Sequence, residues 1–409
     1  MIQSLKVNGL NNQFSGKFKF HRDLNIFTGP NGSCKTTLLK LIWYVISGNL
    51  QQIILEIPFN SISVKTDSFF LTVTHVKSNR VKFEYGFNKR KKTTSKLVVV
   101  TMDPETGALE SFTDANELEE VSGKIVSGIK SSLFFPTFRR VESEFYSLTK
   151  YHNPTNSDYD SNLPSRSLML GRLQEALSAL STALSVEEHK FITSISTHDI
   201  VRLLTQKHID VSGEINILHT TLTSEITEKI LAYSGGEESK IQKSQDAAAV
   251  LDDIQDHVEQ VTQKRKNLLR IFSILTDLVQ KVLKYQSISI TEEIISNEGI
   301  EGITLGKGIN GVTFGAAEDA AISSSKLSSG EKQMLSFLCY NVFSKDTAIF
   351  IDEPELSLHV DWQRLLLPIL LEQETSNQFF IATHSPFIYT MYPDKEFMLD
   401  DTRVYQGEV

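Results

Sequence analysis

The segment "FTGPNGSCKTTLLKL" at residues 27–41 constrains the fold of this chain more than any other feature. It follows the phosphate-loop pattern G-x-x-x-x-G-K-[ST], with Gly29, Lys35 and Thr36 in place and Cys34 where the pattern has its second glycine. The apolar run "LNIFTG" leads into it, and "KTTLLKLIWYVI" has the pattern of a helix. A strand–loop–helix unit of this kind predicts an α/β fold.

Such a loop binds phosphate because backbone N–H groups at the start of a helix point toward the anion. Lys35 is expected to reach the β- and γ-phosphates of a nucleotide, and the Thr36 hydroxyl is expected to bind Mg²⁺. The predicted nucleotide-binding residues are Gly29, Asn31, Gly32, Ser33, Cys34, Lys35, Thr36 and Thr37.

Cys34 is the departure from the pattern, and its cost depends on its backbone conformation. In a right-handed helical conformation a small side chain costs little, whereas a positive φ costs about 1–2 kcal/mol. We expect nucleotide binding to survive this change in weakened form.

Two further segments place polar residues at the ends of apolar runs. "DTAIFIDEPE" (346–355) ends in Asp352 and Glu353, which suits one carboxylate near Mg²⁺ and one that polarises a water molecule. "QFFIATHSPFI" (378–388) runs into His384. Taken singly, each has a structural explanation, an acidic turn or a packed histidine. Strand ends, however, are where open α/β sheets bind ligands.

A fourth segment, "KLSSGEKQ" (326–333), opens a helix. Its structural explanation is a capping box between Ser328 and Glu331. The order of the four segments decides between the interpretations, because together they are far more specific than any one of them.

This order resembles that of the ABC-type ATPases, with "LSSGE" in place of the LSGGQ signature. Within them, "DEPELSLHVDWQ", "ATHSPFI" and "FFPTFRRVES" (134–143) resemble the RecF/SMC-related branch, and in particular OLD-like proteins and stand-alone ATPases of prokaryotic anti-phage defence systems such as PARIS, Septu and retron-associated modules. The resemblance covers residues 1–150 and 300–409.

The resemblance implies a role for each matching residue. Glu353 would be the catalytic base, Asp352 would support Mg²⁺, and His384 would contact the γ-phosphate. Ser328 and Gly330 would complete the ATP site of a second copy, so a homodimer or higher oligomer with ATP between subunits is implied. Arg139 and Arg140 would respond to the nucleotide state. Ser329 replaces the first signature glycine, and slow hydrolysis is expected.

Three regions are predicted: residues 1–150 as the first half of the ATPase core with a β-rich lobe, 151–295 as a helical, coiled-coil-like insertion, and 296–409 as the second half. The insertion contains a 3-4 spacing of ten positions, nine of them apolar, which predicts a long helix with one packing face. An antiparallel helix of the same chain is its expected partner. The positions are Leu251, Ile254, Val258, Val261, Arg265, Leu268, Phe272, Leu275, Val279 and Val282.

Composition and charge exclude several other classes of protein. Two cysteines exclude a disulfide framework and cysteine-based zinc sites, and no apolar run is long enough to span a membrane. A cytoplasmic protein is therefore expected. The net charge of −9 argues against a surface that is basic throughout. The basic run "NKRKK" (88–92) is expected at the tip of a hairpin, more simply as a solvated turn than as a nucleic-acid contact.

The long interval between Lys35 and Ser328, together with the predicted helical arm, argues against a transporter ATPase. OLD-like proteins carry a nuclease after the ATPase, and no second acidic or histidine cluster here predicts one. The leading hypothesis is therefore an ATP-hydrolysing sensor and scaffold of a two-component anti-phage system. It would control a separately encoded effector, typically a nuclease, and respond to a phage protein or DNA. The alternatives are a RecF-like repair ATPase that binds DNA through residues 88–92, and an ATP-binding structural protein in which Cys34 and Ser329 have ended turnover.

Overall fold

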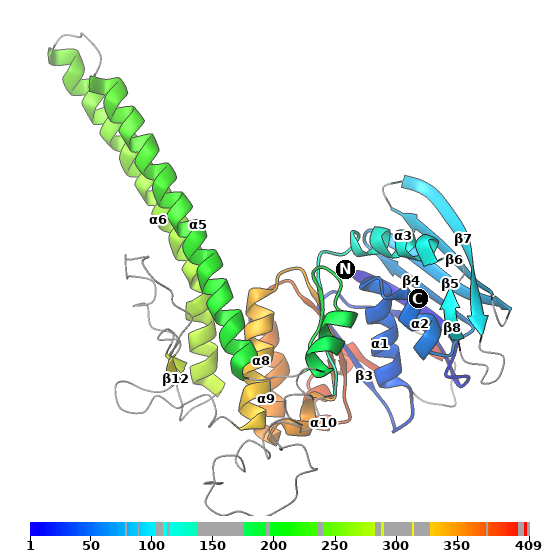
Figure 1. Cartoon of the computed structure of the whole chain (residues 1–409). Coiled ribbons are helices and arrows are strands. Elements are labelled where there is room, and N and C mark those ends of the chain that lie inside the picture. Colours follow the sequence, from blue (N-terminus) through cyan, green and yellow to red (C-terminus); the bar gives the residue numbers. More distant parts are fainter. Residues whose placement is uncertain are drawn as a thin grey trace, which may run out of the picture. The chain divides into compact units, whose positions relative to one another are not determined.

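A computed structural model of the chain describes residues 1–77, 80–88, 90–102, 109–112, 115–137, 176–193, 197–234, 240–282, 288–289, 313–314, 328–373, 375–399 and 405–406. The chain forms two compact units, and Figure 1 shows their elements. The first unit comprises Met1–Ile195, Ser328–Met334 and Ser344–Val409, and the second comprises Ser196–Leu327 and Leu335–Phe343. The predicted boundaries near residues 150 and 295 lie outside the described residues.

A six-stranded parallel sheet forms the centre of the first unit. Its order is β10 (His189–Phe191), β9 (Ser132–Phe135), β13 (Ala348–Asp352), β14 (Gln378–Ala382), β3 (Leu24–Thr28) and β15 (Glu396–Met398). Strands β3, β13 and β14 are buried at every position, as expected for strands of a parallel sheet covered on both faces. The apolar runs before the loop and before His384 are thus neighbouring central strands.

An eight-stranded, largely antiparallel sheet forms the β-rich lobe. Its order is β16 (Tyr405–Gln406), β2 (Phe14–Lys19), β1 (Ile2–Leu10), β4 (Ser61–Thr66), β5 (Phe69–Lys77), β6 (Arg80–Phe87), β7 (Arg90–Met102) and β8 (Leu109–Phe112). β6 and β7 pair with Phe87 opposite Arg90, so the predicted basic run does lie at a hairpin turn. The expected α/β fold with a β-rich N-terminal lobe is confirmed.

The two sheets share one hydrophobic core. Phe20 lies after β2, and its ring meets that of Phe380 in β14 edge-on at 5.0 Å. Gln378 of β14 ties the sheets together, because it accepts a hydrogen bond from the N–H of Ile2 and donates one to its carbonyl, both at 2.8 Å. The run "GKFKFHRDLNIFTG" is therefore two strands in two sheets, separated at residues 20–23.

The helices of the first unit include α1 (Lys35–Ile46), which begins and ends where the sequence predicts. α2 (Leu50–Glu56) was not expected from the strand-like texture of residues 1–100. The others are α3 (Ala115–Val126), a helix over 176–184, η3 (Pro354–Ser357), α9 (Val360–Glu372), α10 (Pro386–Tyr389) and η4 (Pro393–Lys395). α8 (Ser329–Phe343) contributes its first turns to this unit and its remainder to the second.

The second unit contains a helical arm made of α5 (Thr197–Ser234) and α6 (Lys240–Val282), side by side in Figure 1. Lys229 pairs with Asp253, and His208 lies against Phe272 with ring centroids 6.1 Å apart, so the helices run antiparallel. The partner of α6 is therefore α5 of the same chain. A small pairing of β11 (Ile288–Ser289) with β12 (Thr313–Phe314) completes the described part of this unit.

The predicted packing face of α6 is wrong at two positions. Leu251 and Val258 are 65% and 40% exposed. His257, one residue before Val258, is less exposed and lies between Asp253 and Glu225, with Nε2 3.9 Å from Oε2 of Glu225. Charged pairs across the outer part of the arm thus replace the apolar contacts expected there, whereas Phe272 and Leu275 nearer its base are buried. Within the residues that the structure describes, no helix has both the length and the apolarity needed to cross a bilayer.

Candidate nucleotide site

The loop between β3 and α1 requires glycine at its first position. Gly29 has φ 142°, and a Cβ built there would lie 2.2 Å from the carbonyl oxygen of Leu399 and 2.8 Å from Oγ of Ser33. Gly32 also has a positive φ, 86°. Because other residues are strained in such conformations, these two glycines fix the path of the loop.

Lys35 lies within the concave side of this loop. Its Nζ donates to the carbonyl oxygens of Gly29 at 3.0 Å and Pro30 at 2.9 Å, and it lies 3.4 Å from Oγ of Ser33. The residue is only 6% exposed. The ammonium is therefore held over the loop, where a phosphate could replace the carbonyl partners.

Cys34 adopts the positive-φ conformation, which is the strained one of the two weighed from the sequence. Its φ of 67° and ψ of 19° are left-handed, which costs about 1–2 kcal/mol for a residue with a Cβ. Nδ2 of Asn11 lies 3.5 Å from Sγ of Cys34 and 3.3 Å from Oγ1 of Thr37. The thiol thus lies beside Asn11, the residue after β1, and Cys34 is 8% exposed.

Asp352 ends β13 and is bonded to two threonine hydroxyls. Thr36 donates to Oδ1 at 2.9 Å and Thr137 donates to Oδ2 at 2.5 Å. Burial raises the pKa of the Asp352 carboxyl above its ordinary value, the two hydroxyl donors lower it, and the Glu353 carboxylate raises it. Thr137 was not singled out from the sequence, because a lone threonine after a short strand carries no signal.

Glu353 follows in a left-handed conformation, with φ 47° and ψ 55°. Its N–H donates to the carbonyl of Ala382 at 2.8 Å, which fixes it to the end of β14. Its Oε1 lies 4.0 Å from Nε2 of His384. The structure thus brings together Glu353 and His384, both partly exposed, beside the buried Asp352.

Glu355 is a second residue that the sequence analysis missed. Its carboxylate accepts hydrogen bonds from the backbone N–H of His384 at 2.6 Å and from Oγ1 of Thr383 at 2.8 Å. Gln363 of α9 accepts a further bond from Ser385 at 2.6 Å. The turn that carries His384 is therefore held by the segment that follows Glu353. In the sequence, the only sign of this contact is the glutamate that ends the segment "DEPE", which is Glu355.

Ser328 and Glu331 form the capping box that the sequence allows. The Ser328 N–H donates to the Glu331 carboxylate at 2.5 Å, and the Glu331 N–H donates to the Ser328 hydroxyl at 3.3 Å. A Cβ at Gly330 would lie 2.4 Å from the carbonyl oxygen of Ser357. Among the described residues, no hydrogen bond joins Ser328 or Gly330 to the phosphate loop. Arg139 and Arg140 lie outside the described residues.

Comparison with known families identifies this architecture. Residues 24–389 match the family described as "AAA domain, putative AbiEii toxin, Type IV TA system". The chain belongs to this AAA-domain family. The match includes the loop, Asp352, Glu353 and His384, and it spans the helical arm.

The other likenesses are either short or low in sequence identity. The chain is 41% identical over 69 residues to "Endonuclease GajA" of Bacillus cereus (strain VD045), which covers 15% of this chain and only 12% of that protein. The head domain of Smc from Pyrococcus furiosus, solved with an extended coiled coil and bound to the C-terminal domain of ScpA, matches over 98% of this chain and 94% of that chain, at 12% identity and a TM-score of 0.36. An Smc head from Pyrococcus yayanosii, with a coiled coil and joint, matches over 95% and 93%, at 12% identity and 0.37.

The residues at the site suit a nucleotide with Mg²⁺. Within the described residues, no three side chains of His, Cys, Asp and Glu come together as a metal site. A cation would instead be held by hard oxygen atoms of Thr36 and Asp352, which lie 2.9 Å apart, with phosphate oxygens and water completing its coordination. The AAA-domain chain therefore offers an ammonium for phosphate, oxygen ligands for Mg²⁺ and a carboxylate beside them.

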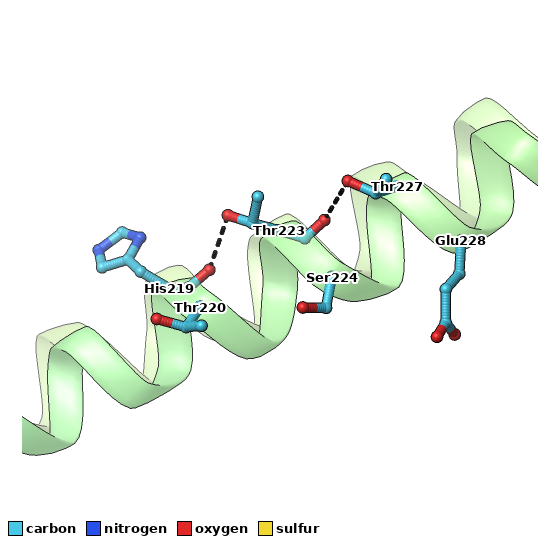
Figure 2. Close-up of a pocket in the computed structure, with 6 residues that line it drawn as sticks. All are labelled: His219, Thr220, Thr223, Ser224, Thr227 and Glu228. Carbon is cyan, nitrogen blue, oxygen red and sulfur yellow. Dashed lines mark hydrogen bonds between the residues drawn. The ribbon is translucent and has the colours of Figure 1, made fainter.

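A separate recess of about 530 Å³ lies on α5. Figure 2 shows that several of its hydroxyls point along the helix, and Thr223 and Thr227 donate to the carbonyls of His219 and Thr223 at 2.8 and 2.7 Å. These two hydroxyls donate within their own helix, so they do not donate to a ligand. Its lining residues are His219, Thr220, Thr223, Ser224, Thr227 and Glu228.

Proposed function

We propose that the protein binds ATP with Mg²⁺ in the loop at residues 29–37 and hydrolyses it slowly. The observation that carries this proposal is the hydrogen bond between Thr36 and Asp352, which joins the phosphate loop to the end of β13. Glu353 and His384 stand beside that contact at 4.0 Å from each other. A phosphate loop, a cation site and a candidate base thus occupy one edge of the parallel sheet.

Each residue has a separate role in this proposal. Lys35 binds the β- and γ-phosphates, and Thr36 and Asp352 hold Mg²⁺, which neutralises charge on the phosphates. Glu353 accepts a proton from the attacking water, and His384 contacts the γ-phosphate. The strain at Cys34 and the side chain of Ser329 account for slow turnover.

A second copy of the chain completes the site in this proposal. Ser328 directly precedes α8 and Gly330 lies in its first turn, and the N-terminus of a helix favours phosphate. In its own chain Gly330 lies beside Ser357, and within the described residues neither Ser328 nor Gly330 has a hydrogen bond to the loop. The resemblance to ABC-type ATPases supports a dimer in which these residues face the ATP of the partner subunit.

The biological role that we propose is an ATP-driven sensor and scaffold of a two-component anti-phage system. Support comes from the family, whose description names a toxin–antitoxin system, and from the local likeness to an endonuclease called GajA. The effector would be encoded separately and would be a nuclease. ATP would hold the assembly together, and recognition of a phage protein or DNA would release it.

The test is a pull-down of tagged Glu353→Gln protein in ATP, from cells that carry the neighbouring genes. Slowed hydrolysis should trap the assembly, and native mass spectrometry should then find an oligomer with a nuclease-like protein. A Glu353→Gln protein that associates with nothing and behaves identically with and without ATP would contradict the proposal.

The alternative is a DNA-binding repair ATPase. The hairpin of β6 and β7 supports it, since residues 88–92 lie at its tip, although the side chains of residues 89–92 lie outside the described part. Duplex or gapped DNA should then stimulate phosphate release, and salt should weaken binding steeply. A rate of ATP hydrolysis that is the same with and without DNA would exclude this alternative.

A further inference from the structure

The outer face of the β-rich lobe carries an unusual concentration of positive charge. The strands β16, β2, β1, β4 and β5, adjacent in that order, contain no aspartate or glutamate. The chain as a whole has a net charge of −9. Four lysines on three of these strands are exposed, and we name them the lysine face: Lys6, Lys17, Lys19 and Lys65.

The strand register places these four side chains together. Lys6 in β1 is directly opposite Lys17 in β2, and Ser4 is opposite both Lys19 and Lys65. Residues opposite each other in neighbouring strands lie on the same face of a sheet. The intervening residues point the other way into the core, as the exposures of Leu5, Val7, Phe18 and Val64 show, all between 0% and 2%.

The spacing of the strands sets the size of the cluster. Neighbouring strands are about 4.8 Å apart, and alternate residues of one strand are about 7 Å apart. The Cα atoms of the four lysines, on three neighbouring strands, therefore lie within an area of about 10 Å by 7 Å. Like charges directly opposite each other, as Lys6 and Lys17 are, destabilise a sheet. Within the described part of the chain no carboxylate pairs with any of the four, and Glu84, the next acid across the sheet, pairs with Lys82 at 2.6 Å.

The residues between the lysines are also suited to phosphate. Ser4, Ser63 and Asn8 share this face with them. Hydroxyl and amide groups donate hydrogen bonds to phosphate oxygens, and with lysine they make up most contacts to a nucleic-acid backbone. A stable membrane contact would need an apolar anchor beside the basic residues, and β1, β2 and β4 present none on this face.

We infer that the lysine face binds the phosphate backbone of a nucleic-acid duplex, independently of ATP. The contact reads no base sequence, because lysine and serine on a flat sheet face reach phosphates rather than base edges. The four lysines of this face are on β1, β2 and β4, whereas the basic run at residues 88–92 is at the turn between β6 and β7, where Asn88 donates to the carbonyls of Thr66 and Asp67 beside Lys65. The lysine face is also distinct from the nucleotide site.

The test is the salt dependence of binding to a fluorescent duplex DNA of mixed sequence, measured by anisotropy without nucleotide. Four phosphate contacts give a slope of log K against log salt of about −3.6, or about 150-fold weaker binding between about 50 and 200 mM salt. In the variant with Lys6→Gln, Lys17→Gln, Lys19→Gln and Lys65→Gln, the slope should become shallower by about 3.6.

The matched control replaces four exposed lysines of other elements by glutamine: Lys190, Lys264, Lys266 and Lys345. It changes net charge equally and should leave the slope within about 1 of the wild-type value. An equal change in both variants, or a wild-type protein without affinity for the duplex, would overturn the inference. Stronger binding to vesicles of equal parts phosphatidylcholine and phosphatidylserine than to the duplex would also overturn it.

A further variant and a further measurement keep the result interpretable. The pair Lys17→Gln and Lys19→Gln alters β2 alone and should make the slope shallower by about 1.8, in case the fourfold variant does not fold. Addition of MgATP should leave the affinity of the wild type for the duplex unchanged. Duplex binding that requires ATP would contradict independence from ATP, whereas failure of ATP hydrolysis alone leaves this inference intact.

Discussion

The hydroxyl of Thr36 donates a hydrogen bond of 2.9 Å to Oδ1 of Asp352 across 316 positions of the sequence. Thr36 lies in the first turn of α1, and Asp352 is the last residue of β13. Strands β3, β14 and β13 are adjacent and parallel, so the segments that follow them meet at one edge of the sheet. The helical arm, which is inserted between Thr36 and Asp352 in the sequence, therefore leaves the two halves of the site in contact.

Asp352→Asn should lower the rate of phosphate release from MgATP by roughly 100-fold, because an amide is a poorer ligand for Mg²⁺ than a carboxylate. The measurement is steady-state phosphate release as Mg²⁺ is titrated. Asp361→Asn is the control, since Asp361 is exposed in the first turn of α9. Equal rates in the two variants would show that Asp352 does not support the metal.

Glu355→Gln should lower kcat by about tenfold while ATP affinity changes less than about twofold. The carboxylate that accepts from the His384 N–H and Thr383 would become neutral, and hydrogen bonds to charged groups are worth about 1.5–3 kcal/mol. Single-turnover kinetics and ATP binding separate the two effects. Glu119→Gln, on the exposed side of α3, controls for loss of charge. An unchanged kcat would remove Glu355 as a positioning residue.

Cys34→Gly should raise the free energy of unfolding by about 1 kcal/mol. Glycine relieves a left-handed strain of about 1–2 kcal/mol, and its greater freedom in the unfolded chain offsets part of the gain. Denaturant unfolding measures the change. Cys34→Ala keeps the Cβ and loses the thiol, so it should not be stabilised. If both variants gained equally, the strain at Cys34 would not be the cause.

Gly330→Ala should lower the free energy of unfolding by about 1–3 kcal/mol, because its Cβ would lie 2.4 Å from the Ser357 carbonyl oxygen. Gly123→Ala in α3 is the matched control. No atom lies within 4 Å of a Cβ built there, and alanine should stabilise that helix by up to about 1 kcal/mol. Opposite signs for the two variants are expected in chemical denaturation. A neutral Gly330→Ala would show that α8 shifts easily away from η3.

Acid should destabilise the first unit through His189. Burial lowers its pKa from the ordinary 6.5, and its Nδ1 lies 2.7 Å from the Ser132 hydroxyl. Below pH 6.5 the unfolded chain binds a proton that the folded histidine does not, so stability present above that pH is lost as pH falls. The loss is at most about 1.4 kcal/mol per pH unit for one histidine.

His189→Gln should make that pH dependence shallower, as measured by denaturant unfolding between neutral and mildly acidic pH. His75 remains as a second contributor, because burial lowers its pKa too. His219→Gln is the control, since His219 is exposed on α5 and outside the first unit. An identical slope in wild type and His189→Gln would show that His189 does not bind protons differently on folding.

Several elements could be predicted from the sequence because local patterns determine them. The limits of α1 followed from the phosphate loop, and β13 and β14 followed from apolar runs that end in polar residues. Thr137 and Glu355 could not be found in this way, because their roles depend on which strand ends meet. The sequence also did not determine the sign of φ at Cys34, since the neighbouring residues are compatible with both a right-handed helical and a left-handed conformation.

The arm shows a different limit. A 3-4 spacing predicted one long helix and its packing face, but Val258 is exposed, whereas the more buried neighbour His257 contacts Glu225 on α5. The face that a long helix turns toward its partner depends in part on the charged side chains of that partner, here Glu225 and Lys229 of α5. A single helical pattern does not contain that information.

The central claim is tested most directly by phosphate release from MgATP, measured side by side for the wild type and Glu353→Gln, with ATP binding measured on both. We predict slow release by the wild type, and release at least about 100-fold lower in Glu353→Gln with ATP still bound. No release by the wild type, or equal release by both proteins, would contradict the account.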